Sequence, residues 1–174
     1  MLNIEIIPCL SDNYSYIIHD SDTNLIGVVD PSEFKPVDQA IEKKYKKIDY
    51  ILNTHHHNDH VGGNEELKKK YKSKIIGYLS DRDRIPGIDI SVKENEIFSL
   101  GNTSFKILFT PGHTSGHIIF YSEKEKVLFT GDTLFSLGCG RLFEGTYKQM
   151  FDSLQKIKKL SKDTKIYCGH EYTK

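Results

Sequence analysis

The sequence comprises 174 residues, of which 37% are hydrophobic and 28% charged. This length and composition argue for one domain with a substantial core and exclude a disordered chain. The 24 Lys and Arg residues balance the 24 Asp and Glu residues, so the net charge is zero and no overall attraction to nucleic acids or membrane surfaces is expected.

Short strands dominate the predicted elements before the first histidine cluster. Runs rich in β-branched or aromatic residues, separated by Ser, Asp and Asn turns, predict strands over residues 3–7, 14–19, 25–30 and 49–54. Between the third and fourth runs, Pro36 opens a helical pattern that places apolar residues on one face and lysines on the other.

Helices and strands alternate less regularly in the rest of the chain. A helix is predicted over residues 64–72, and strands over residues 74–79, 97–100, 104–110, 117–122, 126–130 and 165–168. The clearest helix begins with Thr146 and Gln149 as a capping box, followed by apolar residues at helical spacing. Together the elements predict an α+β fold, with two sheets whose outer faces are covered by helices.

Cysteine content and hydropathy bear on where the protein works. The three cysteines, Cys9, Cys139 and Cys168, are too few and too scattered for a disulfide framework. No apolar stretch approaches the ~20 residues of a membrane span, and the first residues show no signal-peptide pattern. We therefore expect a cytoplasmic protein without membrane or nucleic-acid partners, and a monomer, with a dimer as the alternative.

The most informative segment is THHHNDH at residues 54–60, which directly follows a predicted strand. If His55 and His57 continue an extended backbone, their rings point to one side and the ring between them points away. Asp59 and His60 come where a Gly-Gly pair turns the chain into the next helix, so they can face the same cavity. Imidazole and carboxylate ligands suit zinc, iron or manganese.

Three more predicted strands end in a small-residue turn that carries a ligand-type side chain. These side chains are His113 in TPGHT, Asp132 in TGDT and His170 in CGH. Alone, each has an ordinary explanation, such as a hydrogen-bonded turn histidine or a helix cap. Strand ends converge on one edge of a layered fold, however, so the four segments can bring seven ligands together. We therefore predict a dinuclear metal site with an acidic residue between the ions.

These motifs resemble those of the metallo-β-lactamase superfamily. Its shared motifs are the segment at 54–60 with the glycines that follow, TPGHTSGH at 110–117 and FTGDTLF at 129–135. GCGRLFEGT at 138–146 and YCGHEYT at 167–173 are specific to the glyoxalase II (hydroxyacylglutathione hydrolase) branch. The resemblance runs from about residue 3 to the last residue. It implies a four-layer αββα sandwich of two mixed β-sheets, with helices on the outer faces and a metal site at one edge.

The resemblance also assigns roles to individual residues. It implies two divalent metal ions per chain, with zinc favoured over iron or manganese. One ion would be bound by His55, His57 and His113, and the second by Asp59, His60 and His170, with Asp132 bridging the two. Asp59 and Asp132 would act in catalysis together with a metal-bridging hydroxide. The glutathione part of the substrate would contact Arg141, Phe143 and Tyr172.

The implied activity is hydrolysis of S-2-hydroxyacylglutathione, typified by S-D-lactoylglutathione, to D-lactate and glutathione in methylglyoxal detoxification. Because metal-activated water replaces a protein nucleophile, Cys139 is interpreted as a turn residue. The alternatives are a sulfur dioxygenase-like enzyme, a broad thioesterase or lactonase, and a weakly active metal-binding remnant. A nuclease is disfavoured by the zero net charge.

Two features depart from the family pattern. Phe143 stands where some members have a tyrosine that contacts glutathione. Members also continue into a helical carboxyl-terminal domain that supplies further basic glutathione contacts, whereas this sequence ends at Lys174. We therefore expect a single catalytic domain over residues 1–174 without that helical domain, with a complete metal site and a reduced glutathione site.

Overall fold

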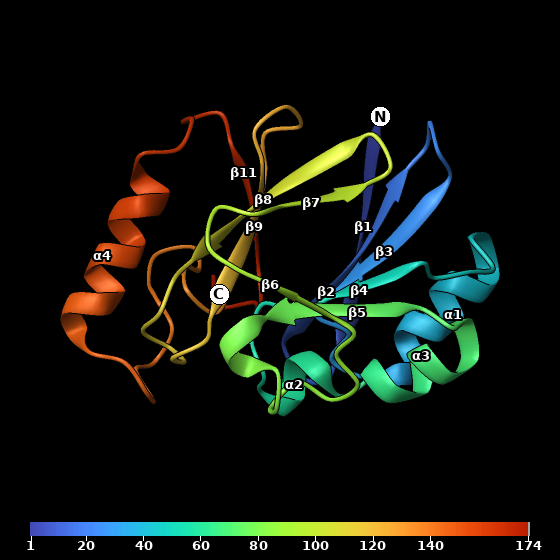
Figure 1. Ribbon diagram of the computed structural model, residues 1–174, viewed down its shortest axis with the longest axis horizontal. Helices are drawn as coiled ribbons and strands as arrows, with labels where there is room; N and C mark the ends of the chain where they lie inside the picture. Colours follow the sequence, from blue (N-terminus) through green and yellow to red (C-terminus); the bar gives the residue numbers. More distant parts are fainter. Residues whose placement is uncertain (174) are drawn as a thin grey trace.

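Two β-sheets packed face to face form the centre of the computed structural model, which describes residues 1–173 (Figure 1). The first sheet has six strands in the order β1-β2-β3-β4-β5-β6. They span β1 Leu2–Cys9, β2 Asn13–Asp20, β3 Leu25–Val29, β4 Tyr50–Leu52, β5 Lys74–Tyr78 and β6 Ile90–Val92. The first three strands are antiparallel, and the pairs from β3 to β6 are parallel, so the sheet is mixed.

The second sheet has five strands in the order β11-β10-β9-β8-β7. They span β7 Ile97–Leu100, β8 Thr103–Phe109, β9 Ile118–Ser122, β10 Val127–Gly131 and β11 Lys165–Cys168. Strands β7 to β10 are antiparallel, whereas β11 pairs with β10 in parallel. A parallel pair needs a crossover connection, which here contains helix α4 (Tyr147–Lys158).

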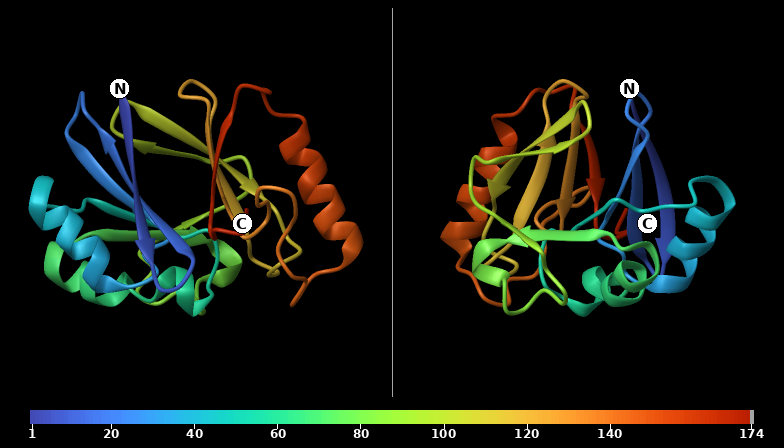
Figure 2. Two further views of the ribbon diagram at one scale, coloured as in Figure 1. Left: turned by 180° about the vertical axis from the view of Figure 1, so that it is seen from behind. Right: turned by 45° about the vertical axis from the view of Figure 1, so that its right-hand side comes forward.

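Helices cover both outer sides of the paired sheets (Figure 2). The first sheet carries α1 (Phe34–Lys44), α2 (Asn58–Val61) and α3 (Asn64–Tyr71), and α4 packs on the second sheet. A short 3₁₀ helix, Leu79–Asp81, follows β5. Within residues 1–173, none of the helices is both long and apolar enough to cross a membrane.

Three hydrophobic cores separate these four layers. Adjacent residues of β2 enter different cores: Ile17 packs with the helices on the first sheet, and Ile18 lies between the two sheets. In β8, Ile107 lies between the sheets and Leu108 packs towards α4. A strand that is buried on both faces has a nearly continuous run of apolar residues, as the central parts of β2 and β8 do. The predicted αββα sandwich is therefore confirmed.

The predicted elements are largely confirmed, with three differences. Asp59 and His60 lie in the short helix α2 rather than in a turn, and strand β6 was not predicted. Strand β4 ends at Leu52, two residues earlier than predicted. Helix α2 has four residues and β6 three, which is too short for hydrophobic periodicity to appear. The capping box of Thr146 and Gln149 is present.

Candidate metal centre

The candidate site lies where the two sheets meet, beyond the carboxyl ends of β4, β8, β10 and β11. Backbone hydrogen bonds join the sheets here. The Tyr14 N–H donates to the Gly169 carbonyl at 2.8 Å, and the Ile118 N–H to the Thr54 carbonyl at 2.9 Å. This junction gathers segments that are far apart in the sequence around one cavity.

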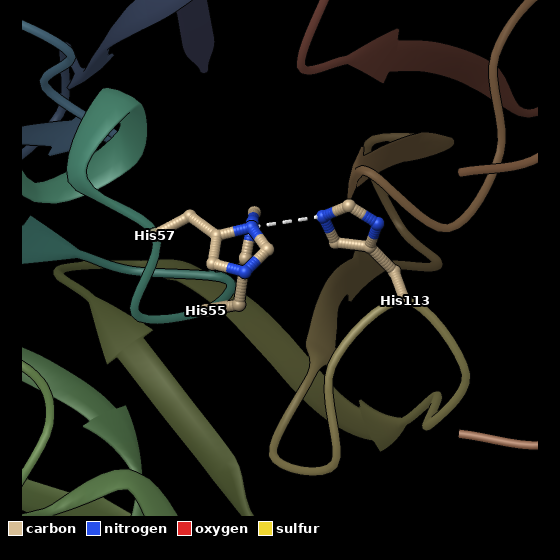
Figure 3. Close-up of side chains that lie close together, drawn as sticks. All are labelled: His55, His57 and His113. Carbon is tan, nitrogen blue, oxygen red and sulfur yellow. Dashed lines mark hydrogen bonds between the residues drawn. The ribbon is translucent and has the colours of Figure 1, made fainter. Parts of the chain in front are cut away.

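Three histidines converge on one side of the site (Figure 3). One ring nitrogen from each of His55, His57 and His113 lies within 4.8 Å of the others. His55 and His57 lie 4.7 Å apart between ring centroids and present their rings to the same side, as their alternation predicts. The Nδ1 atom of His57 faces the Nε2 atom of His113 at 3.0 Å. We call these three residues the first triad.

A second group of ligand atoms lies beside the first. Asp59 and His60 come from α2, and His170 comes from the segment after β11. Their ligand atoms lie within 4.8 Å of one another. The Oδ2 atom of Asp59 is 3.5 Å from His60 Nε2 and 3.3 Å from His170 Nε2. We call these residues the second triad.

Asp132 lies between the two triads. Its Oδ2 atom is 3.3 Å from the Nε2 atoms of both His113 and His170, and its Oδ1 atom is 3.3 Å from His60 Nε2. The preceding Gly131 has a φ of 47°, and a Cβ atom there would collide with Thr54. One carboxylate therefore touches both triads, and all seven predicted ligand side chains lie together.

The outer ring nitrogens of four of these histidines are already hydrogen-bonded. The partners are Thr54 Oγ1 for His55 (3.0 Å), Asp30 Oδ2 for His60 (3.1 Å), the Arg141 carbonyl for His113 (2.7 Å) and Asp12 Oδ1 for His170 (2.9 Å). Each bond leaves the Nε2 atom of that ring directed into the site. Hydrogen bonds of this kind orient histidines that ligate metals.

Some of the inward-facing atoms are buried without a hydrogen-bond partner. They are His55 Nε2, His60 Nε2 and Asp132 Oδ1. Burying an unpaired polar atom costs about 1–3 kcal/mol. Nitrogen and carboxylate atoms that are buried, clustered and free of partners are the donors that a divalent metal ion satisfies. The residues present therefore fit a divalent metal.

Charge inside the site is strongly coupled. Burial, together with the charge of neighbouring histidines, lowers the pKa of His55 well below its ordinary value. For His60, burial acts in the same direction, but the carboxylates of Asp132 and Asp30 outweigh it and raise the pKa to about 10. Burial acts to raise the pKa of Asp132, but His60, His170 and His55 together outweigh it and hold that pKa below its usual range. The ionised carboxylates therefore require nearby positive charge, which a divalent cation provides while leaving the imidazoles neutral.

Sequence reasoning missed several residues that support the ligands. Asp30 is buried directly after β3 and accepts hydrogen bonds from the Thr54 N–H at 2.8 Å and the Thr54 hydroxyl at 2.6 Å. The buried His117 accepts from the Asp132 N–H at 3.1 Å and stacks on the His55 ring. Sequence reasoning places Asp30 inside the predicted strand over residues 25–30 and gives it no role in the site. Its position, a carboxylate at the end of a buried apolar run, is the signal that identifies it.

The predicted substrate residues line the same cavity as the ligands. Two members of each triad, His57 and His113 of the first and Asp59 and His170 of the second, line this cavity of about 650 Å³ together with Asp132. Arg141, Phe143, Tyr172 and the exposed Cys139 also line it. The Tyr172 ring stacks on His170 with centroids 5.0 Å apart. The Phe143 ring lies edge-on to His113 at 5.3 Å, and the Arg141 guanidinium lies 5.7 Å from the centre of the Phe143 ring.

Known proteins share both the sequence and the fold. The family model of the metallo-β-lactamase superfamily matches residues 10–170. A hydroxyacylglutathione hydrolase of Pelagibacter ubique is 60% identical over 99% of this chain and 72% of its own length. A hydroxyacylglutathione hydrolase of Methylococcus capsulatus is 49% identical over 99% of this chain and 68% of its own length.

Solved structures agree on the fold. The BLEG-1 B3 metallo-β-lactamase has a TM-score of 0.88 at 24% identity, covering 97% of this chain and 92% of that one. ETHE1 from Myxococcus xanthus has a TM-score of 0.86 at 26% identity, covering 99% of this chain and 76% of that one. The chain therefore belongs to the metallo-β-lactamase superfamily and, within it, to the family of the hydroxyacylglutathione hydrolases.

Proposed function

We propose that this chain hydrolyses the thioester of S-2-hydroxyacylglutathiones, typified by S-D-lactoylglutathione, and releases D-lactate and glutathione in methylglyoxal detoxification. Relatives that carry the name hydroxyacylglutathione hydrolase, 49–60% identical over 99% of the chain, support this activity. The observation that carries the proposal is the Asp132 carboxylate, which touches both triads inside a cavity that Arg141 also lines.

We propose two divalent metal ions. Zinc suits these nitrogen and oxygen donors best. The first triad would hold one ion and the second triad the other, with Asp132 shared between them. When bound, such ions supply Lewis acidity, which lowers the pKa of water and polarises a carbonyl group. The catalytic roles of Asp59 and Asp132 are to hold this arrangement and to supply its negative charge.

The other wall of the cavity suits the glutathione part of the substrate. The Arg141 guanidinium lies over the Phe143 ring and Arg141 lines the cavity, where it would bind a glutathione carboxylate. Phe143 and Tyr172 add aromatic surface on either side of the ligands. The departing thiolate has a conjugate acid with a pKa of about 8.5, so it leaves without strong protonation. No role as a nucleophile is assigned to Cys139.

Turnover of S-D-lactoylglutathione by residues 1–174, which we propose to act as one catalytic domain, tests the function. The metal content is counted in the same sample. We expect two metal ions per chain and loss of the thioester absorbance with release of free thiol. A metal-loaded chain that leaves the thioester intact would contradict the proposal. Oxygen consumption with glutathione persulfide in place of thioester cleavage would favour the dioxygenase alternative.

A further inference from the structure

A second cluster of charged and polar side chains lies next to the first triad, and its members are not among the residues that line the cavity. We call it the Arg84 network, and its members are His56, Asp81, Arg84, Ser115 and Glu144. The Arg84 guanidinium donates to Asp81 Oδ1 at 2.5 Å, Glu144 Oε1 at 2.7 Å and Ser115 Oγ at 3.0 Å. It also lies 3.3 Å from His56 Nε2, whose Nδ1 atom is 3.2 Å from Asp81 Oδ2.

The partners of Arg84 belong to the segments that form the proposed site. His56 stands between two ligands of the first triad, and Ser115 comes two residues after its third ligand, His113. Glu144 directly follows Phe143 in the loop that carries Arg141. One guanidinium therefore joins both ligand segments of the first triad and the loop proposed to bind glutathione.

The network is built more tightly than a surface ion pair. The Asp81 side chain is fully buried, and a Cβ atom at Gly116 would collide with its carboxylate, so the backbone after His113 packs directly on Asp81. Glu144 accepts hydrogen bonds from both the N–H and the hydroxyl of Ser115, each at 2.7 Å. Burial acts to raise the pKa of Glu144, but Ser115 and Arg84 outweigh it and lower the pKa to about 2.

The second triad is held by other residues. Asn13 Nδ2 donates to Asp59 Oδ2 at 3.0 Å, Asp30 bonds His60, and Asp12 bonds His170. Asp30 also bonds Thr54, which bonds His55, so this one carboxylate serves both triads. The Arg84 network, in contrast, touches only segments of the first triad and the loop of Arg141. We propose that the Arg84 network positions the first triad and the loop of Arg141, with Arg84 and Glu144 as its positioning residues. This inference rests on the proposed two-metal site and adds the assignment of a support to one half of it.

Zinc titration of the metal-free chain against a chromophoric chelator tests the assignment in two backgrounds. Asp59→Ala disables the second triad and reports on the first, and His57→Ala does the reverse. Loss of outer support lowers metal affinity about 10- to 100-fold. We expect Arg84→Met to lower zinc affinity by that factor in the Asp59→Ala background and by less than about threefold in the His57→Ala background.

Arg82→Met is the matched control, because Arg82 is an exposed arginine two residues away. We expect it to leave zinc affinity unchanged in both backgrounds. Should Arg84→Met fail to fold, as judged by circular dichroism, Glu144→Gln carries the same comparison. Equal losses in both backgrounds, or none in the Asp59→Ala background, would overturn the inference.

A second measurement addresses the Arg141 loop. With both metal sites saturated, we expect Glu144→Gln to raise KM for S-D-lactoylglutathione about threefold to tenfold and to leave kcat within about twofold. A lower kcat at unchanged KM would contradict a role in positioning that loop. If the chain binds zinc but does not cleave the thioester, the proposed function fails while the titrations still test the network.

Discussion

The two walls of the cavity are built differently. On the metal wall, His55, His60 and Asp132 are buried, and fixed hydrogen bonds orient both histidines before any ligand binds. On the substrate wall, beside the ligands, Phe143 and Tyr172 are 59% and 55% exposed, and their contacts are mainly with other aromatic rings. The fold thus orients the metal ligands by buried hydrogen bonds, whereas the substrate side is exposed and held mainly by ring contacts. Substitutions on the two walls should therefore separate metal affinity and kcat from KM.

Asp132→Ala should have the largest effect. It removes the carboxylate that touches both triads and leaves buried imidazoles facing one another without it. We expect kcat/KM for S-D-lactoylglutathione to fall on the order of 10³-fold, together with the loss of at least one metal ion per chain. Steady-state kinetics with elemental analysis measure both. Asp152→Ala, which removes an exposed carboxylate from α4, is the control and should change neither. Full metal content with normal turnover in Asp132→Ala would contradict the proposed role of Asp132 as the carboxylate shared by the two triads.

Asp30→Asn tests whether the supports of the metal wall matter as much as its ligands. The substitution keeps the side-chain shape but removes the charge that faces His60 and Thr54. We expect zinc affinity at the second triad to fall about 10- to 100-fold, measured by chelator competition. Glu144→Gln should leave that affinity unchanged. An Asp30→Asn protein with wild-type affinity would mean that preorganisation by outer hydrogen bonds has little effect.

Arg141→Ala probes the exposed wall. We expect KM for S-D-lactoylglutathione to rise about tenfold, with kcat within about twofold and the metal content unchanged, since the proposed role of Arg141 is to bind substrate and its guanidinium lies over the Phe143 ring. A small thioester without glutathione provides the control reaction, and its kinetics should not change. An equal loss on both substrates would indicate that Arg141 acts on the metal wall.

Phe143→Tyr should have the smallest effect and the opposite sign. The added hydroxyl supplies the hydrogen bond that a tyrosine at this position makes to glutathione in some family members. One hydrogen bond contributes about 0.5–1.5 kcal/mol, so we expect KM to fall about threefold. Thermal melting should show unchanged stability, because the ring lies at the exposed mouth of the cavity. A higher KM would indicate that the mouth is already complementary to the substrate.

The metal wall was largely predictable from sequence because strand geometry determines it. The alternation of His55 and His57 and the glycines beside His113, Asp132 and His170 are local patterns, and each occurs where a strand ends. The resemblance to a known family then divided the ligands into two sets, and the side chains of each set lie together in the structure, where Asp30 also groups with His55 and His60. Local pattern and fold class together were sufficient for this half.

The supports of the site could not be predicted in the same way. Asp30 and His60 are 30 residues apart, and Arg84 and Glu144 are 60 residues apart. No periodicity relates such pairs, because their proximity arises only when strands from different parts of the chain become neighbours. The short elements α2 and β6 were missed for a related reason. Their conformation is imposed by tertiary packing, since four and three residues carry no repeat.

The junction of the two sheets has a consequence for biosynthesis. Asp12 orients His170, the Tyr14 hydroxyl donates to Glu171 at 2.7 Å, and the Glu171 N–H donates to the Asp12 carbonyl at 2.8 Å. The contact between Asp12 and His170 spans 158 positions of the polypeptide. During translation, the histidines of the first triad therefore leave the ribosome well before His170 can complete the second. Under the proposed assignment of a metal ion to the second triad, its binding follows the emergence of His170 and links the segment of Asp12 to that of His170.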